Sequence, residues 1–184
     1  MPEAKLKKTE HGLVPESDGW FVLNARDAPW SHTNGLGSAC FFEGETPFPE
    51  MGLNVNVMQP GEAGAMYHAE GHQEGFLVLA GEGLLIVEGE ERPLQEWDYA
   101  HTPPDTPHVL VAAGDRPFVY IAAGSRSDAP SRLQYPVDET AQRHGAGVSE
   151  ATSSGKEAYA GFEVGPGAYR KGDLPVFVTR PMTR

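Results

Sequence analysis

Residues 60–111 read PGEAGAMYHAEGHQEGFLVLAGEGLLIVEGEERPLQEWDYAHTPPDTPHVLV and concentrate the side chains that could carry chemistry. Four of the seven histidines lie here, together with two glutamates close to the first pair. These residues are His68, Glu70, His72, Glu74, His101 and His108. Imidazole and carboxylate donors together suit divalent Fe, Mn, Ni or Zn, and the stretch contains no cysteine to favour a closed zinc site. It therefore predicts a divalent metal centre.

Between the histidines lie two apolar runs, residues 76–80 (FLVLA) and 84–87 (LLIV). The intervening Gly81-Glu82-Gly83 predicts a tight hairpin whose two faces are both apolar. Both faces must then be covered, either by the terminal arms or by a second subunit, so we expect a homodimer. Further strands are expected at residues 20–24, 39–43, 53–58, 97–101, 108–112 and 117–122, with a loop at 31–38.

The length and composition indicate one all-β domain. A chain of 184 residues is long enough for one sizeable core, and its 22 glycines and 16 prolines are spread along the sequence, as in a fold of short strands and turns. We expect an N-terminal arm at 1–19, a barrel at 20–124, and a C-terminal region at 125–184.

The C-terminal region is expected to begin with a short helix at residues 137–143, which Pro136 precedes and Gly145 follows. The remainder has weak periodicity and reads as an extended arm over the barrel, with disorder as the alternative. The aromatic and aliphatic side chains that could dock this arm are Tyr159, Phe162, Tyr169, Val176 and Phe177.

The charge balance excludes several partners. A formal net charge of −12 makes nucleic acid and anionic membrane surfaces poor partners, because phosphate binding relies on clustered lysine and arginine. No secretory h-region and no 18-residue apolar run occurs, so we expect a cytoplasmic protein. The single cysteine, Cys40, excludes an internal disulfide, and its apolar neighbours favour a buried thiol over a nucleophile.

The spacing of the chemical residues resembles the two motifs of the cupin superfamily. The positions that stand for the first motif are Gly61, His68, Glu74 and Gly81, with the family's six-residue interval before the last glycine. Those that stand for the second motif are Pro103, Thr106, Pro107 and His108. The resemblance implies a jelly-roll barrel, also described as a double-stranded β-helix, in which both motifs face one cavity and hold a metal.

The resemblance implies His68, Glu74 and His108 as metal ligands and leaves the next one open. Glu70 stands where the family has the second histidine of His-x-His, so either its carboxylate or the imidazole of His72 takes that place. Strand parity does not choose, because 68, 70, 72 and 74 all share one face. His101 is expected to support a ligand or to line the cavity wall, with a structural role as the alternative.

The resemblance also implies a range of functions. A metal-binding cupin of this kind could be a dioxygenase, or a sugar isomerase or epimerase, acting on a small organic molecule. The alternative is a cupin that binds a small molecule without turnover. The residues do not choose between an enzyme and a binding protein, and they assign no catalytic residue.

Overall fold

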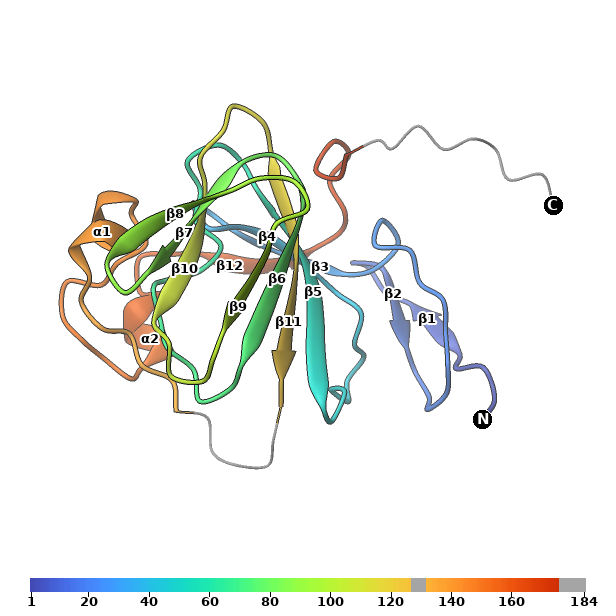
Figure 1. The fold of residues 1–184 in the computed structure, drawn as a ribbon. Helices are drawn as coiled ribbons and strands as arrows, with labels where there is room; N and C mark the ends of the chain where they lie inside the picture. Colours follow the sequence, from blue (N-terminus) through green and yellow to red (C-terminus); the bar gives the residue numbers. More distant parts are fainter. Residues whose placement is uncertain (127–131, 176–184) are drawn as a thin grey trace.

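Two antiparallel sheets facing each other form the body of the protein, in a computed structural model that describes residues 1–126 and 132–175 (Figure 1). The larger sheet has the order β12-β3-β4-β5-β11-β6-β9 and the smaller one β10-β7-β8, while β1 and β2 pair separately. The strands are β1 (Leu6–Lys8), β2 (Leu13–Pro15), β3 (Trp30–Thr33), β4 (Gly37–Phe41), β5 (Met51–Met58), β6 (Glu74–Ala80), β7 (Gly83–Val87), β8 (Glu90–Leu94), β9 (Tyr99–Thr102), β10 (His108–Ala112), β11 (Phe118–Ser125) and β12 (Val164–Gly167). The predicted all-β, jelly-roll class is confirmed.

An inner core fills the space between the two sheets. Alternate residues of each strand point inward, so both sheets contribute to one apolar cluster. Its buried members are Met58, Phe76, Val78, Leu85, Leu110, Ala112, Phe118 and Tyr120. This layer joins the larger sheet to the smaller one and forms the apolar floor beneath the candidate site.

The predicted hairpin between residues 76–80 and 84–87 is wrong. β6 pairs with β11 and β9 in the larger sheet, whereas β7 pairs with β10 and β8 in the smaller one. Gly81, at φ +80°, turns the chain from one sheet to the other against the carbonyl of Pro117. A glycine-rich turn between apolar strands is compatible with a hairpin or with such a corner, and local sequence does not distinguish them.

Two other local predictions are also wrong. Residues 20–24 form no strand, because no neighbouring strand is available to pair with them beyond an isolated bridge from Trp20 to Glu3. Residues 31–38, expected as a loop, contain the end of β3, a turn and the start of β4. The remaining predicted strands each overlap an observed strand.

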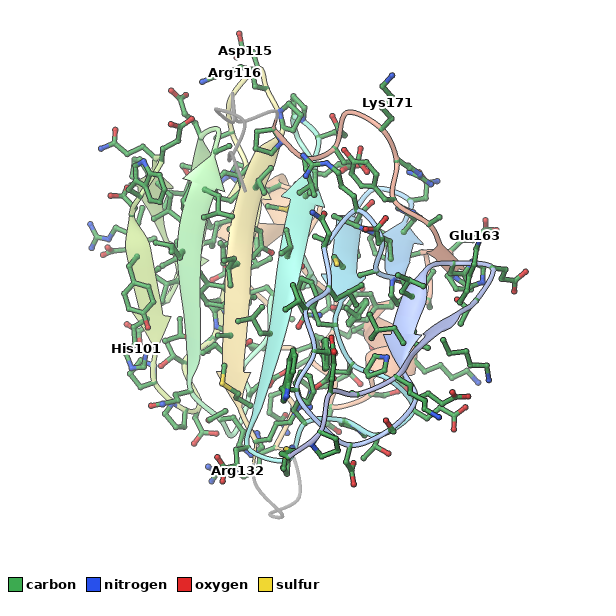
Figure 2. The ribbon with its side chains drawn as sticks, turned by 90° about the vertical axis from the view of Figure 1, so that its right-hand side faces the viewer. His101, Asp115, Arg116, Arg132, Glu163 and Lys171 are labelled. Atoms are coloured by element: carbon green, nitrogen blue, oxygen red, sulfur yellow. The ribbon has the colours of Figure 1, made fainter. Side chains whose placement is uncertain are left out.

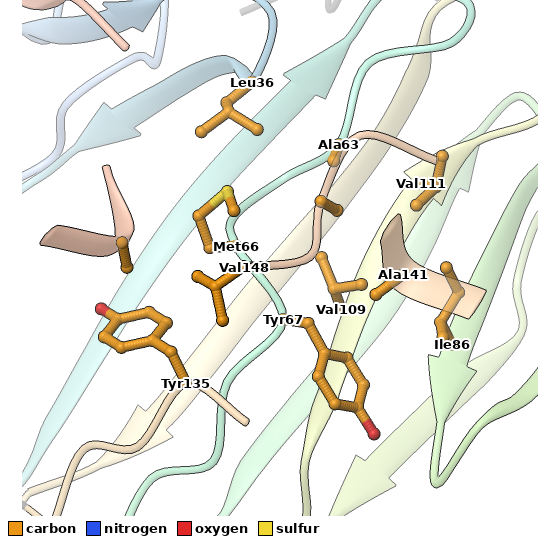
Figure 3. Packing of buried hydrophobic residues seen from close by; sticks show 12 residues of the cluster. Leu36, Ala63, Met66, Tyr67, Ile86, Val109, Val111, Tyr135, Ala141 and Val148 are labelled. Carbon is orange, nitrogen blue, oxygen red and sulfur yellow. The ribbon is translucent and has the colours of Figure 1, made fainter. Parts of the chain in front are cut away.

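The C-terminal region covers the outer face of the smaller sheet (Figures 1 and 3). It contains the short helices α1 (Glu139–Arg143) and α2 (Gly155–Ala158). An outer core packs between these helices and the sheet; its buried members are Leu36, Ala63, Met66, Tyr67, Ile86, Val109, Val111, Tyr135, Ala141, Ala146, Val148 and Ala158. The chain itself therefore supplies the cover that the apolar outer face of this sheet requires.

The predicted docking residues of the arm are placed in two locations. Tyr159 and Phe162 pack against the outer core. Tyr169 lies on the larger sheet, with its ring centroid 5.9 Å from that of Trp30. Val176 and Phe177 lie outside the described residues.

The outer face of the larger sheet is covered over only part of its width. N-terminal residues cross the β3, β4 and β5 side, where Cys40 is fully buried and burial raises the pKa of its thiol to about 12. Figure 2 looks onto this face. Within the described part of the chain, no segment covers the side formed by β9, β6 and β11. Within residues 1–126 and 132–175, no helix has the length and apolar character needed to cross a bilayer.

The corner between the sheets gives a first testable prediction. A Cβ atom on Gly83 would lie 2.6 Å from the ring of Phe118, which is fully buried in the inner core. We expect Gly83→Ala to lower the free energy of unfolding by about 1–3 kcal/mol, because an overpacked core must shift to accept the methyl group. Denaturant unfolding measures the free energy of unfolding of this variant. The control is Gly161→Ala, whose Cβ would meet no atom within 4 Å. Equal losses of stability in the two variants would contradict the packing explanation.

Candidate metal centre

A segment at residues 63–69 lies alongside β10 and carries the first candidate ligand. His68 and His108 exchange both main-chain hydrogen bonds, at 3.1 and 2.9 Å, as directly paired antiparallel residues do. On its other side the segment bonds to the C-terminal region, where the Tyr67 N–H donates to the Ala146 carbonyl at 2.7 Å. The segment therefore extends the smaller sheet by one irregular strand, and the pairing places the two imidazoles side by side.

The third candidate ligand comes from the opposite sheet. Glu74 is the first residue of β6 and shares the inward parity of Phe76 and Val78, so its side chain enters the space between the sheets. His108 opens β10 in the smaller sheet and its ring lies 5.3 Å from that of Phe76. The fold thus brings together Glu74 and His108, which are 34 positions apart along the chain.

The three side chains converge on one point. One ligand atom from each of His68, Glu74 and His108 can be chosen so that all three lie within 4.8 Å of one another. The Nε2 atom of His108 is 3.2 Å from Oε2 of Glu74, and the two imidazole centroids are 5.2 Å apart. Among the described residues this is the one group of three or more such side chains with metal-binding geometry.

The main chain fixes which nitrogen of each imidazole faces this point. Nδ1 of His68 lies 2.7 Å from the carbonyl oxygen of Met66, and Nδ1 of His108 lies 2.9 Å from that of Thr106. A carbonyl can only accept, so both Nδ1 atoms must carry a proton. In a neutral ring the lone pair is then on Nε2, which is the usual arrangement of a metal-binding histidine.

The donor set has the chemistry of a cation site. Among the described residues, the buried Oε2 of Glu74 has a hydrogen-bond partner only when Nε2 of His108, 3.2 Å away, carries a proton. When His108 is neutral, both facing atoms are acceptors, and a shared cation or an added proton must lie between them. The residues present therefore fit a divalent metal ion, which would be held by two imidazole nitrogens and one carboxylate oxygen.

Histidine charges set the pKa of Glu74. Burial alone would raise it, but a hydrogen bond from protonated His108 and the positive charges of His108, His68 and His72 outweigh burial. The pKa of Glu74 is therefore held below its ordinary value. The carboxylate is ionised and available as a ligand through the neutral pH range.

The other predicted site residues are placed around this group but not in it. The Glu70 carboxylate lies 3.7 Å from Nε2 of His68, with a third of its side chain exposed. His72 is close enough to lower the pKa of Glu74 but is not a member of the three-residue group. His101 is exposed on the outer face of the larger sheet (Figure 2), where its Nδ1 lies 3.1 Å from the main-chain oxygen of Glu74. His101 thus contacts the strand that carries a ligand, not the space between the sheets.

Sequence reasoning missed one polar residue beside the site. Thr102 pairs with Glu74 in the β6–β9 register, is 2% exposed, and has a buried hydroxyl with no hydrogen-bond partner in the described part of the chain. Its parity relative to His101 could have revealed it, because neighbouring residues of a strand point to opposite faces. A buried threonine hydroxyl beside the carboxylate can donate a hydrogen bond to Glu74 or to a bound molecule.

Two tyrosines that no motif contains, Tyr135 and Tyr159, also lie near the centre. The hydroxyl of Tyr159 accepts the N–H of Met66, two residues before His68, at 3.1 Å. Tyr135 has its ring centroid 6.1 Å from that of His68, and burial, followed by the neighbouring Tyr159 and Glu70, raises its pKa to about 12. Both come from the C-terminal region, where the sequence gives no local signal for the site. Their distance from the motifs explains why they could not be assigned.

The fold and the two motifs identify the family. The model of the cupin domain matches residues 54–124, which include β6, β10, most of β5 and β11, and all three converging side chains. Residues 54–124 belong to the cupin superfamily. The expectation drawn from the motifs is therefore confirmed for this part of the chain.

The chain is also similar to several solved structures. The polyketide cyclase RemF from Streptomyces resistomycificus is 12% identical over 62% of this chain and 84% of its own, with a TM-score of 0.53. A sugar phosphate isomerase of the cupin superfamily from Silicibacter pomeroyi is 22% identical over 56% of this chain, with a TM-score of 0.45. A provisionally named sugar phosphate isomerase from Acidithiobacillus ferrooxidans is 27% identical over 47% of this chain, with a TM-score of 0.45. The matches span 62% and 56% of these two isomerase chains.

No protein with a curated description matches this chain. The similarity to RemF shows a shared fold. At 12% identity it gives no information about a shared reaction.

The lowered pKa of Glu74 makes the stability of the metal-free protein depend on pH. A carboxyl whose folded pKa lies below its unfolded value contributes stability above the unfolded pKa and loses it as pH falls through the folded one. We therefore expect Glu74→Gln to be less stable than the parent protein at pH 5.5, and the gap to close as the pH falls below the ordinary value of 4.5. Denaturant unfolding in the presence of a chelator measures it.

The control for this comparison is Glu45→Gln at an exposed position, which should match the parent protein throughout. A gap for Glu74→Gln that stays constant from pH 5.5 to pH 3 would show that the carboxylate charge does not contribute.

Proposed function

We propose that this protein is a metal-dependent cupin in which His68, Glu74 and His108 bind one divalent ion, Fe, Mn, Ni or Zn. The observation that carries the proposal is the convergence of the three donor atoms within 4.8 Å, with both Nδ1 atoms committed to main-chain carbonyls. Two histidines and one carboxylate leave coordination positions open for other ligands. A bound ion with open positions could polarise a carbonyl or take part in redox chemistry.

A small organic molecule is the proposed substrate or ligand. The side chains of Glu74 and His68 are 18% and 13% exposed, so the centre is in contact with solvent while most of its surroundings are buried. The acidic charge balance supports the view that neither nucleic acid nor an anionic membrane is a partner, and we place the protein in the cytoplasm. The chain's own residues would bind the molecule, orient it and limit the access of water.

The donor set favours an oxygenase over the other reactions. Two histidines and one carboxylate are the ligands of the facial triad of non-haem iron oxygenases. A sugar isomerase or epimerase would need a base close to the ion as well, and Glu70 is the candidate for that role because its carboxylate lies 3.7 Å from His68. A cupin that binds its ligand without turnover is the remaining alternative.

Metal content tests the proposed centre. The parent protein, His68→Ala, Glu74→Gln and His108→Ala would each be stripped, loaded with Fe(II) without oxygen or with Mn(II), Ni(II) or Zn(II), and analysed for bound metal. We expect each variant to bind at least about tenfold more weakly, since even residues that only support a ligand change affinity by about 10–100-fold.

The matched control is His101→Ala, which removes an imidazole from the outer face of the same pair of strands. It should bind like the parent protein, and equal binding by all five proteins would refute the proposed ligands. Retention of zinc on purification would argue against an oxygenase, because dioxygen chemistry needs a redox-active ion and carbonyl polarisation does not.

We also propose that the protein is a homodimer that associates through the uncovered side of the larger sheet. This surface contains a hollow of about 310 Å³. Its apolar lining includes Met51, Leu77, Tyr99, Ile121 and Ala123. Tyr99 and Met51 are 65% and 46% exposed, and a second copy of the chain would bury them.

Light scattering tests the dimer. At micromolar concentration the parent protein should have the mass of two chains, and Tyr99→Glu should have the mass of one, because it would place a charge from each copy in the interface. Val164→Glu changes another exposed apolar residue, on β12, and should remain a dimer. A single-chain mass for the parent protein would rule out the proposed association.

A further inference from the structure

A chain of hydrogen bonds runs from the His68 imidazole into the C-terminal region. The Nδ1–H of His68 donates to the carbonyl of Met66 at 2.7 Å. That carbonyl and the N–H of Tyr67 belong to the same peptide unit, and the N–H donates to the Ala146 carbonyl at 2.7 Å. One peptide unit is therefore held at both ends, by the candidate ligand on one side and by the C-terminal region on the other.

A second hydrogen bond holds Met66 through its N–H group. The hydroxyl of Tyr159 accepts the N–H of Met66 at 3.1 Å. The ring of Tyr159 packs edge-on against that of Tyr135 at 5.9 Å, and Tyr135 in turn lies 6.1 Å from His68. Figure 3 shows Met66, Tyr67 and Tyr135 from close by, within the outer core. Both main-chain groups of Met66 are thus bonded in ways that restrict its movement.

The end of helix α1 places the Ala146 carbonyl. The helix closes at His144, and Gly145 adopts φ +69°, the left-handed conformation that commonly ends a helix. The N–H of Ala146 then bonds back to Ala141 at 2.9 Å, and Ala146 is fully buried in the outer core. A fixed helix end therefore points this acceptor at the Tyr67 N–H.

The other candidate imidazole has no such connection. His108 donates from Nδ1 to the carbonyl of Thr106, whose peptide unit continues into Pro107. Proline has no N–H, so no hydrogen bond can extend from that peptide unit. Of these two histidines, only His68 is therefore connected by this chain of hydrogen bonds to a distant part of the sequence.

We propose that Ala146 and Tyr159 are positioning residues for His68, so that the C-terminal region tunes the metal centre from outside the family match at 54–124. The proposal rests on the proposed metal-binding function. A peptide unit that donates at one end is a stronger acceptor at the other, because hydrogen bonds in series polarise one another. The stronger acceptor holds the proton on Nδ1, fixes the ring orientation, and makes Nε2 a better metal donor.

The test compares Tyr159→Phe with Tyr169→Phe. Each substitution keeps the ring and removes a hydroxyl that accepts a main-chain N–H, from Met66 in the first case and from Gly172 in the second. Co(II) is the probe, with affinity measured by chelator competition and coordination by its visible spectrum. We expect Tyr159→Phe to weaken Co(II) binding by about tenfold and to change the spectrum, and Tyr169→Phe to change neither.

A second pair of variants acts on the Ala146 carbonyl. Gly145→Ala and Gly172→Ala both place a methyl group at a positive φ with no atom within 4 Å, but only Gly145 precedes Ala146. Nitrogen NMR of the labelled histidine rings in the metal-free protein reports which nitrogen of His68 carries the proton. We expect mixed protonation of the ring in Gly145→Ala and Tyr159→Phe, and Nδ1 protonation alone in the controls.

The outcomes separate this proposal from the one on which it rests. Unchanged Co(II) binding, spectra and ring signals in both Tyr159→Phe and Gly145→Ala would overturn the positioning role, even if His68→Ala abolishes binding. Equal Co(II) binding by the parent protein and His68→Ala would instead overturn the metal site. In that case the nitrogen NMR signals of His68 in the metal-free protein still show whether Ala146 and Tyr159 fix its protonated nitrogen.

Discussion

The pair of main-chain hydrogen bonds between His68 and His108 is the constraint on which the centre depends. It attaches the irregular segment at 63–69 to β10 and puts two imidazoles on directly opposed positions of one sheet. Directly paired residues point to the same face, so both rings enter the space between the sheets. Glu74 reaches them only because the inner core holds the opposite sheet at a fixed separation.

The surroundings of the three donors strengthen the electrostatic interactions between charges at this point. Phe76 lies against His108, and the buried Tyr120 beside it has its pKa raised by burial and by the charge of Glu74. A less polar environment strengthens the attraction between a cation and a carboxylate, and it also penalises a carboxylate left unpaired. The same burial that defines the core therefore strengthens the attraction between Glu74 and a cation bound at this point.

The sequence was informative where period and spacing are local. The strand predicted at residues 53–58 lies within β5, where Val55 and Val57 are on the outer side and Met58 is in the inner core. The family motifs selected His68, Glu74 and His108, which the structure brings together. The sequence could not show that the turn at 81–83 changes sheets, that Tyr135 lies next to His68, or that the Tyr159 hydroxyl accepts the N–H of Met66. All three depend on contacts between distant segments, which leave no periodic signal.

The order of the chain has a consequence for its synthesis. A ribosome delivers β7, β10 and the segment at 63–69 before residues 134–159, which supply the outer core and the remaining hydrogen bonds. Until those residues emerge, the apolar outer face of the smaller sheet stays open to water and to other nascent chains. The growing protein therefore has an aggregation-prone interval that ends only when residues 134–159 have emerged.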